Sequence, residues 1–383
     1  METAQLPGIF YELISKKAKE EFKNLWNLVQ RIKSNTNAHQ NGRNKRLITT
    51  EPLKLSNIFK NLPPSLDFKL ENFLLYHSIS LEEAFIENAE LNGAELNRAN
   101  LNDAKLNGAQ LNGAQLNDAE LNRAQLNRAQ LNDAKLISAQ LNDAQLNDAK
   151  LISAKLNRAK LINAQLNGAE LNGAELNEAK LNDAKLNRAK LDRAQLNGAQ
   201  LNRAQLNDAQ LNDAKLISAK LISAKLIGAE LNRAQLNGAQ LNDAQLNDAQ
   251  LNGAELNDAQ LNDAKLNGAK LNGAKLDRAQ LNHAQLNDAT LDGAELNRAQ
   301  LNHAQLNGAK LNGAKLNNAQ LDDIVINNQT NFNNTKLKNI KCNRIKLLVS
   351  DDNIEEFNTE ETIRDKFIQL GAKKENISFA QAA

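Results

Sequence analysis

Five side chains that could bind a metal recur at one constant interval in the second half of the chain. They are Asp243, Asp263, His283, His303 and Asp323. Imidazole and carboxylate groups are ligands that zinc uses in proteins. A metal site also requires that its ligands converge on one point and that further side chains hold their orientation. The backbone that carries these five side chains decides whether they converge.

That backbone repeats one five-residue word. From Ala84 to Asp323 the chain reads A-x-L-x-x without an insertion, which is 240 residues or 48 words, and only Ile86 replaces the leucine. We name the leucine slot i, so the alanine slot is i−2. Slot i−1 is mostly Gln, Lys or Glu, slot i+1 is mostly Asn, and slot i+2 is mostly Gly, Asp, Arg or Ser.

Neither a helix nor a flat strand fits a period of five. In a helix, five residues advance by about 500°, so the leucines would spiral over every side. In a flat strand, an odd spacing would place successive leucines on opposite faces. A short extended piece followed by an Asn-Gly or Asn-Asp bend does fit, because Ala and Leu then point to the same side and the bend contains residues that tolerate tight turns.

Four such words with roughly right-angled corners close a square coil of 20 residues. Coils of this kind stack through main-chain hydrogen bonds about 4.8 Å apart, so the 48 words predict a rod of twelve coils and roughly 58 Å. Leucine and alanine then fill the interior and leave no cavity of ligand size. Because each coil contacts only its neighbours, stability is expected to accumulate along the rod.

Residues four words apart then stack in a straight column on a solvated face. The column of aspartates and histidines therefore lacks the convergence of a metal site. The sequence also lacks a Ser–His–Asp or Cys–His group and a phosphate-binding glycine motif. We predict no catalytic, cofactor-binding or metal-binding residue, no cofactor and no enzymatic activity.

The words "AELNG", "ANLND" and "AKLNR" resemble the pentapeptide repeat family, whose motif is A(D/N)Lxx. The resemblance implies an all-β solenoid, a right-handed quadrilateral β-helix with slots i and i−2 inside. This chain departs from the family at i−1, where the family favours Asp or Asn and this chain favours Gln and Lys. The departure concerns the surface and the turns.

Both ends of the array are expected to need caps, because an open coil exposes unpaired strand groups and apolar side chains. After Ile326 the pattern resumes with a shift of one residue, and four pairs occupy slots i−2 and i: Thr330/Phe332, Thr335/Leu337, Ile340/Cys342 and Ile345/Leu347. Cys342, the only cysteine, is thus predicted to be a buried structural thiol. Upstream, the pairs Phe68/Leu70 and Phe73/Leu75 predict a first, irregular coil.

The flanking segments are predicted to be helical. We expect three parts in the chain. Residues 1–66 form an N-terminal helical segment and basic linker, and residues 67–348 form the β-helix, with regular repeats at 84–323 and irregular capping coils at both ends. Residues 349–383 form a short C-terminal helical cap or tail. In the last part, Thr359 is the expected N-cap of a helix that ends near Gln369. This helix could cap the rod or form a homodimer contact.

Residues 9–33 carry apolar side chains at helical spacing with lysines elsewhere, and residues 34–49 are polar and basic. A cap or a partner-docking segment is the favoured interpretation of residues 9–33. Contact with a membrane surface is the alternative. Without a signal peptide or an apolar run near the ~18 residues of a membrane span, we expect a soluble, cytoplasmic protein.

The surface carries no dominant charge or apolar stripe. Formal charge is +2 for the chain, and residues 84–323 hold 26 basic and 28 acidic side chains, a net charge of −2. No nucleic-acid partner is therefore expected. Six isoleucines at the outward slot i+1 wrap around the rod: Ile137, Ile152, Ile162, Ile217, Ile222 and Ile227.

The leading functional hypothesis is a non-catalytic structural scaffold or protein–protein interaction rod with an unidentified partner. One alternative follows from the resemblance: a DNA-mimicking protein that binds a topoisomerase such as gyrase. Its mimicry would require a strongly negative rod, which this chain lacks. Another is a secreted bacterial effector whose N-terminal helix binds a membrane or a partner. Ice binding is not expected, because Thr290 is the only threonine in the 48 words.

Overall fold

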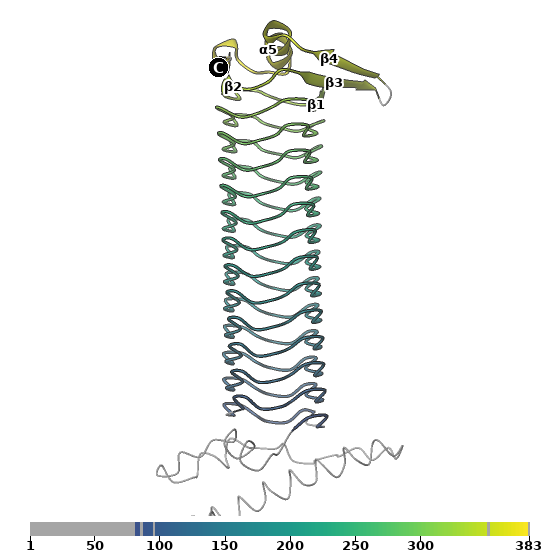
Figure 1. Ribbon diagram of the computed structural model, residues 1–383, viewed down its shortest axis with the longest axis vertical. Coiled ribbons are helices and arrows are strands. Elements are labelled where there is room, and N and C mark those ends of the chain that lie inside the picture. Colours follow the sequence, from purple (N-terminus) through teal and green to yellow (C-terminus); the bar gives the residue numbers. More distant parts are fainter. Residues whose placement is uncertain (1–80, 85–86, 95, 351–352, 382–383) are drawn as a thin grey trace, which may run out of the picture.

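The computed structural model describes residues 81–84, 87–94, 96–350 and 353–381. These residues form a straight rod of stacked coils that ends in a small cap of strands and one helix (Figure 1). The helix expected at 9–33, the linker at 34–49 and the irregular coil expected around residues 68–75 lie outside the described residues.

Each coil of the rod takes four five-residue words. The residue at slot i−1 forms a parallel bridge with the equivalent residue four words later, as Lys105 does with Gln125. Main-chain hydrogen bonds lie on both sides of these bridges. The N–H of Lys105 donates to the carbonyl oxygen of Ala84 (2.8 Å), and the N–H of Leu106 donates to the carbonyl oxygen of Gln125 (2.6 Å). The coil therefore has the length expected from the sequence.

The corners are tight turns with a left-handed residue at slot i+2. The N–H of each alanine donates to the carbonyl oxygen of the leucine three residues earlier, as from Ala209 to Leu206 (3.1 Å). At slot i+2, φ is +57° for Asp208 and +67° for Gly228. A positive φ at the third residue, together with this hydrogen bond, is a feature of type II turns. Glycine and aspartate tolerate that geometry, which explains why they are frequent at this slot.

The interior contains only leucine and alanine over most of the rod. From Ala104 to Leu321, every leucine and alanine of the words is at most 1% exposed. The predicted inward direction of slots i and i−2 is therefore confirmed. A buried leucine contributes about 1.5–3 kcal/mol, and four leucines in each coil make this the main stabilising feature of the fold.

Asparagines at slot i+1 form ladders along the corners. The Oδ1 atom of Asn92 accepts hydrogen bonds from the main-chain N–H of Asn112 (3.0 Å) and from its Nδ2 (3.1 Å). The Nδ2 atom of Asn92 in turn donates to Oε1 of Gln110 (3.3 Å), at slot i−1 of the next coil. The ladder thus gives an acceptor to a main-chain N–H that the strand bridges leave free.

The six isoleucines at slot i+1 interrupt these ladders. They lie on the outside of the rod, from half-buried to exposed, as the sequence predicts. Ile222 donates its N–H to Oδ1 of Asn202 (3.1 Å) but has no oxygen to offer the next coil. Among the described residues, none accepts a hydrogen bond from the main-chain N–H of the asparagine that lies one coil after each isoleucine: Asn157, Asn172, Asn182, Asn237, Asn242 and Asn247.

Replacing Ile222 with asparagine is expected to raise the free energy of unfolding by about 0.5–1 kcal/mol. The new Oδ1 atom would accept a hydrogen bond from the N–H of Asn242, and this gain exceeds the loss of partly exposed apolar contact. Chemical denaturation followed by far-UV circular dichroism measures the difference. Ile222→Val is the control because it keeps the ladder broken. Equal unfolding midpoints for the two variants would contradict a stabilising role for the ladder.

Seven short elements follow the regular array. They are β1 (Ile324–Asn327), β2 (Leu337–Ile340), β3 (Ile345–Ser350), β4 (Asn353–Phe357), α5 (Glu360–Gln369), a 3-10 helix (Lys374–Asn376) and β5 (Ile377–Phe379). Strand β3 pairs in parallel with β1 and antiparallel with β4, while β2 pairs in parallel with β5. Ile324 lies opposite Ile345, so the last coil has one residue more than the others.

The interior of this last coil follows the shifted pattern. All eight residues assigned to its inward slots are at most 6% exposed, which confirms the four predicted pairs. The hydroxyl groups of Thr330 and Thr335 donate to the carbonyl oxygens of Leu306 (2.9 Å) and Leu311 (2.7 Å), so neither buried oxygen lacks a partner. Cys342 is buried, and this burial raises the pKa of its thiol well above the usual value.

Helix α5 covers the end of the rod, in the segment where the sequence predicts a helix. Thr359 is its N-cap, and its side chain accepts a hydrogen bond from the N–H of Thr362 (3.2 Å). Phe367 is fully buried and packs edge-to-face on Phe332 of the last coil, with ring centroids 4.9 Å apart. At Gly371, φ is +101° and an added Cβ would lie 3.2 Å from the backbone of Asn333, so any other residue would be strained there. The alternative role of this helix as a homodimer contact stays a prediction.

The hairpin formed by β3 and β4 differs from the sequence prediction. The expected boundary after residue 348 falls inside β3, which continues to Ser350 and then pairs back with β4. Leu347 lies opposite Glu355, and Leu348 lies opposite Ile354. No further word bends the chain into another coil, so the extended direction of β3 persists and antiparallel pairing satisfies its outer edge.

Candidate functional site

The column of aspartates and histidines lies along one corner of the rod. The rings of His283 and His303 are stacked with their centroids 4.7 Å apart and 6° between their planes. Nδ1 of His303 lies 3.8 Å from Oδ2 of Asp323. Asp323 itself is held by Arg344 and by Lys346, whose Nζ lies 3.4 Å from Oδ1. The side chains therefore form a stack along the rod axis rather than a cluster around one point.

Two further observations concern the described part of the chain. Within it, no group of three or more His, Cys, Asp or Glu side chains could hold a metal ion. Within the same residues, none of the helices has the length and hydropathy needed to cross a bilayer. The charged corners and a surface pocket are further candidates for a functional site.

Ion pairs at the corners join successive coils. Arg123 binds Asp103 with two hydrogen bonds, from Nε to Oδ1 (2.7 Å) and from Nη2 to Oδ2 (2.6 Å). These hydrogen bonds hold the pKa of the Asp103 carboxyl below its usual value. Arg203, Arg233 and Arg278 bind the aspartate one coil earlier in the same way. Each pair is solvent-exposed, so it contributes little to stability.

The pair at Asp323 predicts a dependence of stability on pH. The hydrogen bond from Arg344, with a smaller effect of Lys346, holds the pKa of Asp323 below its usual value, although burial opposes the shift. The ionised carboxylate is therefore stabilising above the unfolded-state pKa of about 3.9, and this stabilisation is lost as the pH falls through the lower folded-state pKa. Asp323→Asn is expected to lower the free energy of unfolding by roughly 0.5–1 kcal/mol at neutral pH and by less in acid.

Urea denaturation at neutral pH and at about pH 2.5, below the unfolded-state pKa, tests this prediction. Asp243→Asn is the matched control, because Asp243 lies in the same column and makes no ion pair with any described residue. A loss of stability that is the same at both pH values would contradict the assigned role of the Asp323 carboxylate.

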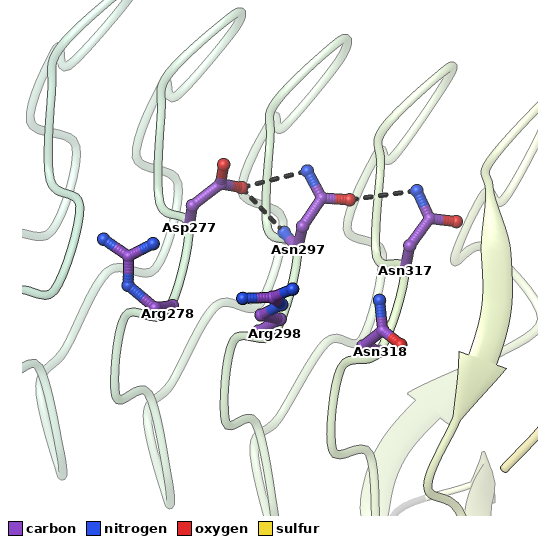
Figure 2. Close-up of a pocket in the computed structure, with 6 residues that line it drawn as sticks. All are labelled: Asp277, Arg278, Asn297, Arg298, Asn317 and Asn318. Carbon is purple, nitrogen blue, oxygen red and sulfur yellow. Dashed lines mark hydrogen bonds between the residues drawn. The ribbon is translucent and has the colours of Figure 1, made fainter.

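The surface pocket lies near the C-terminal end of the rod, across three successive coils. Its volume is about 460 Å³, and it is lined by Asp277, Arg278, Asn297, Arg298, Asn317 and Asn318. Figure 2 shows these side chains in two parallel rows, one from slot i+1 and one from slot i+2. The pocket is therefore a shallow feature between two corner columns and does not reach the leucine interior.

The two rows of the pocket differ in their hydrogen bonds. In the first row, Oδ1 of Asp277 accepts from the N–H (2.9 Å) and Nδ2 (3.0 Å) of Asn297, and Oδ1 of Asn297 accepts from Nδ2 of Asn317 (3.0 Å; Figure 2). In the second row, Arg278 is bound to Asp258 outside the pocket. The side chain of Arg298, also in the second row, makes no ion pair or hydrogen bond with any described residue.

This pocket was not predicted from the sequence, although a signal was present. Written at intervals of four words, one column of slot i+2 reads Asp258, Arg278, Arg298, Asn318. Two consecutive arginines break the usual alternation of charge. Adding the charges of the whole rod conceals this local surplus, whereas reading the charges column by column reveals it.

The geometry defines a class of protein: a four-sided β-solenoid with a filled interior and laddered faces. Two family models match the chain, one described as a pentapeptide repeat region (139–216) and one as pentapeptide repeats in eight copies (79–118, 114–151, 214–253, 244–282, 254–293 and 279–318). Together these matches run without a gap from residue 79 to 318, which is more than half of the chain. The chain belongs to the pentapeptide repeat family, and the right-handed quadrilateral β-helix is the fold that this membership implies.

Solved structures of the same family resemble the chain. HetL, a pentapeptide repeat protein involved in heterocyst differentiation regulation from the cyanobacterium Nostoc sp. strain PCC 7120, is 31% identical over 63% of this chain and 96% of its own, with a TM-score of 0.30. Rfr23 from the cyanobacterium Cyanothece 51142 is 27% identical over 33% and 91%, with a TM-score of 0.24. QnrB1, a plasmid-mediated fluoroquinolone resistance protein, is 18% identical over 50% and 91%, with a TM-score of 0.22. No curated protein sequence matches the chain.

Proposed function

We propose that the protein is a non-catalytic rod that binds protein partners through its outer surface. The observation that carries this proposal is the filled interior. Leucine and alanine occupy every inward slot from Ala104 to Leu321 at no more than 1% exposure. The rod therefore offers a partner only its faces, its corners and its ends. A cytoplasmic location is part of the same proposal.

The C-terminal cap supplies surface that the repeats do not contain. Val349 and Ile354 on the β3–β4 hairpin are 44% and 52% exposed, and Ile368 on α5 is 36% exposed. Within the described part of the chain, strand β4 is also an edge strand, paired on one side only. Exposed apolar side chains beside a free strand edge are typical of surfaces that bind other proteins.

Affinity capture with the full chain from its native cell, followed by mass spectrometry, tests the proposal. A partner is expected to co-purify in a fixed ratio and to bind the purified chain directly. Ile354→Glu changes the hairpin surface, and Arg298→Gln changes the pocket, without altering any inward slot. Loss of the partner with one variant would locate the interface, whereas absence of any stoichiometric partner would contradict the proposal.

The charge pattern favours this rod over the DNA-mimicking alternative. A DNA mimic must present the dense negative charge of phosphates, while residues 84–323 carry a net charge of only −2. Several of the acidic groups are also paired with arginine or lysine of an adjacent coil. We expect micromolar protein to leave DNA supercoiling by gyrase unchanged, and inhibition in that assay would restore the alternative. The secreted-effector alternative depends on residues 9–33, which lie outside the described residues, and stays a prediction.

A further inference from the structure

The corner arginines follow a rule that one of them breaks. Ten arginines occupy slot i+2: Arg98, Arg123, Arg128, Arg158, Arg188, Arg193, Arg203, Arg233, Arg278 and Arg298. Nine of them have an aspartate or a glutamate four words before or after them, which is one coil away in the same column. Arg298 is the exception, because Arg278 precedes it and Asn318 follows it.

The missing partner has a defined geometry. In the neighbouring pair, Nε and Nη2 of Arg278 donate to the two carboxylate oxygens of Asp258, and both donor–acceptor distances are 2.6 Å. A guanidinium group prefers this bidentate contact with a planar carboxylate. At Arg298, the position one coil earlier that a carboxylate would occupy holds a second guanidinium. A carboxylate that pairs with Arg298 must therefore come from outside the described residues.

A second donor and one acceptor complete the pocket. Oδ1 of Asn318 accepts from Nδ2 of Asn339 (2.7 Å), but Nδ2 of Asn318 donates to no described residue and lines the pocket beside Arg298. On the facing row, Oδ2 of Asp277 accepts no hydrogen bond from any described residue. The pocket thus combines donors on one row with a carboxylate oxygen on the other (Figure 2).

We propose that this pocket binds an acidic side chain of a protein partner, with its carboxylate on Arg298 and Asn318. Asp277 then accepts a main-chain N–H of the same segment. The negative charge of Asp277 favours a singly charged carboxylate over a doubly charged phosphate, since like charges repel across the pocket. This inference rests on the proposed function and names the chemistry that the rod recognises.

Binding of a fluorescein-labelled hexaglutamate peptide with blocked ends, measured by fluorescence anisotropy on the full chain, tests the inference. Arg298→Gln is expected to weaken binding about tenfold, as the loss of one charged hydrogen-bonded pair would. Arg188→Gln is the matched control, because Arg188 is also an exposed corner arginine that makes no ion pair with a described residue, but it has Asp208 one coil away. The excess of basic residues in 1–70, twelve against six acidic, affects every variant equally.

A second variant keeps Arg298 and provides a carboxylate from within the chain. Asn318→Asp places an aspartate one coil after Arg298, where it competes with the peptide, and is expected to weaken binding as much as Arg298→Gln does. Ser218→Asp adds the same charge at another slot i+2 and is expected to have little effect. Unchanged binding by both Arg298→Gln and Asn318→Asp would overturn the inference.

Competition experiments separate the possible ligands. Free glutamate at equal ionic strength is expected to displace the peptide more effectively than inorganic phosphate, and the opposite order would overturn the carboxylate assignment. Capture of a partner that Arg298→Gln does not weaken would remove this inference and leave the proposed function intact. Peptide binding that requires Arg298, without any captured partner, would support the carboxylate chemistry of the pocket and contradict the proposed function.

Discussion

Replacing Phe367 with alanine is expected to lower the free energy of unfolding of the C-terminal cap by about 3–5 kcal/mol. The side chain is fully buried, and its ring packs against Phe332, which fills an inward slot of the last coil. The substitution removes this contact and leaves a cavity between α5 and the rod. Differential scanning calorimetry, together with far-UV circular dichroism, measures the loss.

Ile368→Ala is the matched control, because Ile368 is the next residue of the same helix and is 36% exposed. Its effect is expected to stay below about 1 kcal/mol. When the cap detaches, the last coil exposes unpaired strand groups, so the Phe367→Ala variant is also expected to associate. Light scattering after size-exclusion chromatography measures this. A stable, monodisperse Phe367→Ala variant would contradict the capping role of α5.

Replacing Leu206 with alanine in the middle of the rod is expected to cost about 2–5 kcal/mol. Leu206 is 1% exposed and lies between coils that are themselves filled, so the walls can collapse only partly into the cavity. The neighbouring surface substitution Gln205→Ala is the control and is expected to change stability by no more than about 0.5 kcal/mol.

The shape of the unfolding curve gives a second test of the Leu206 prediction. Because each coil contacts only the coils next to it, a weak coil in the middle lets the coils on either side of it unfold independently. Urea denaturation followed by far-UV circular dichroism is expected to change from one transition to two. A single transition with an unchanged midpoint would contradict the assignment of the interior leucines as the main stabilising contacts.

The sequence predicts the rod well because one physical requirement recurs in every word. Leucine and alanine at positions two apart must point to the same side, and an Asn-Gly or Asn-Asp pair must turn the chain. The same requirement persists in the last coil, where Phe332 and Cys342 take inward slots despite the shift of one residue. The N-cap at Thr359 was also predictable, because a hydroxyl before two glutamates is typical of a helix start.

The parts that the sequence did not predict depend on contacts between distant residues. Strand β4 forms only because β3 leaves the last coil with a free edge, and nothing local in "NIEEF" requires that pairing. The pocket at Arg298 depends on which side chain lies one coil away, so it is visible only in the columns. Similarly, the N–H of Asn242 has no acceptor among the described residues because Ile222 lies one coil earlier, and the word that contains Asn242 gives no sign of this.

The coil length of four words limits how such a chain can change its length. Deleting a single word would keep every remaining leucine inside, but it would rotate all that follows by a quarter of a turn. Arg298 and the β3–β4 hairpin would then point in a new direction relative to the N-terminal coils. Deleting four words would shorten the rod by one coil and leave that direction unchanged. Duplications and losses compatible with a fixed arrangement of partners should therefore occur in multiples of four words.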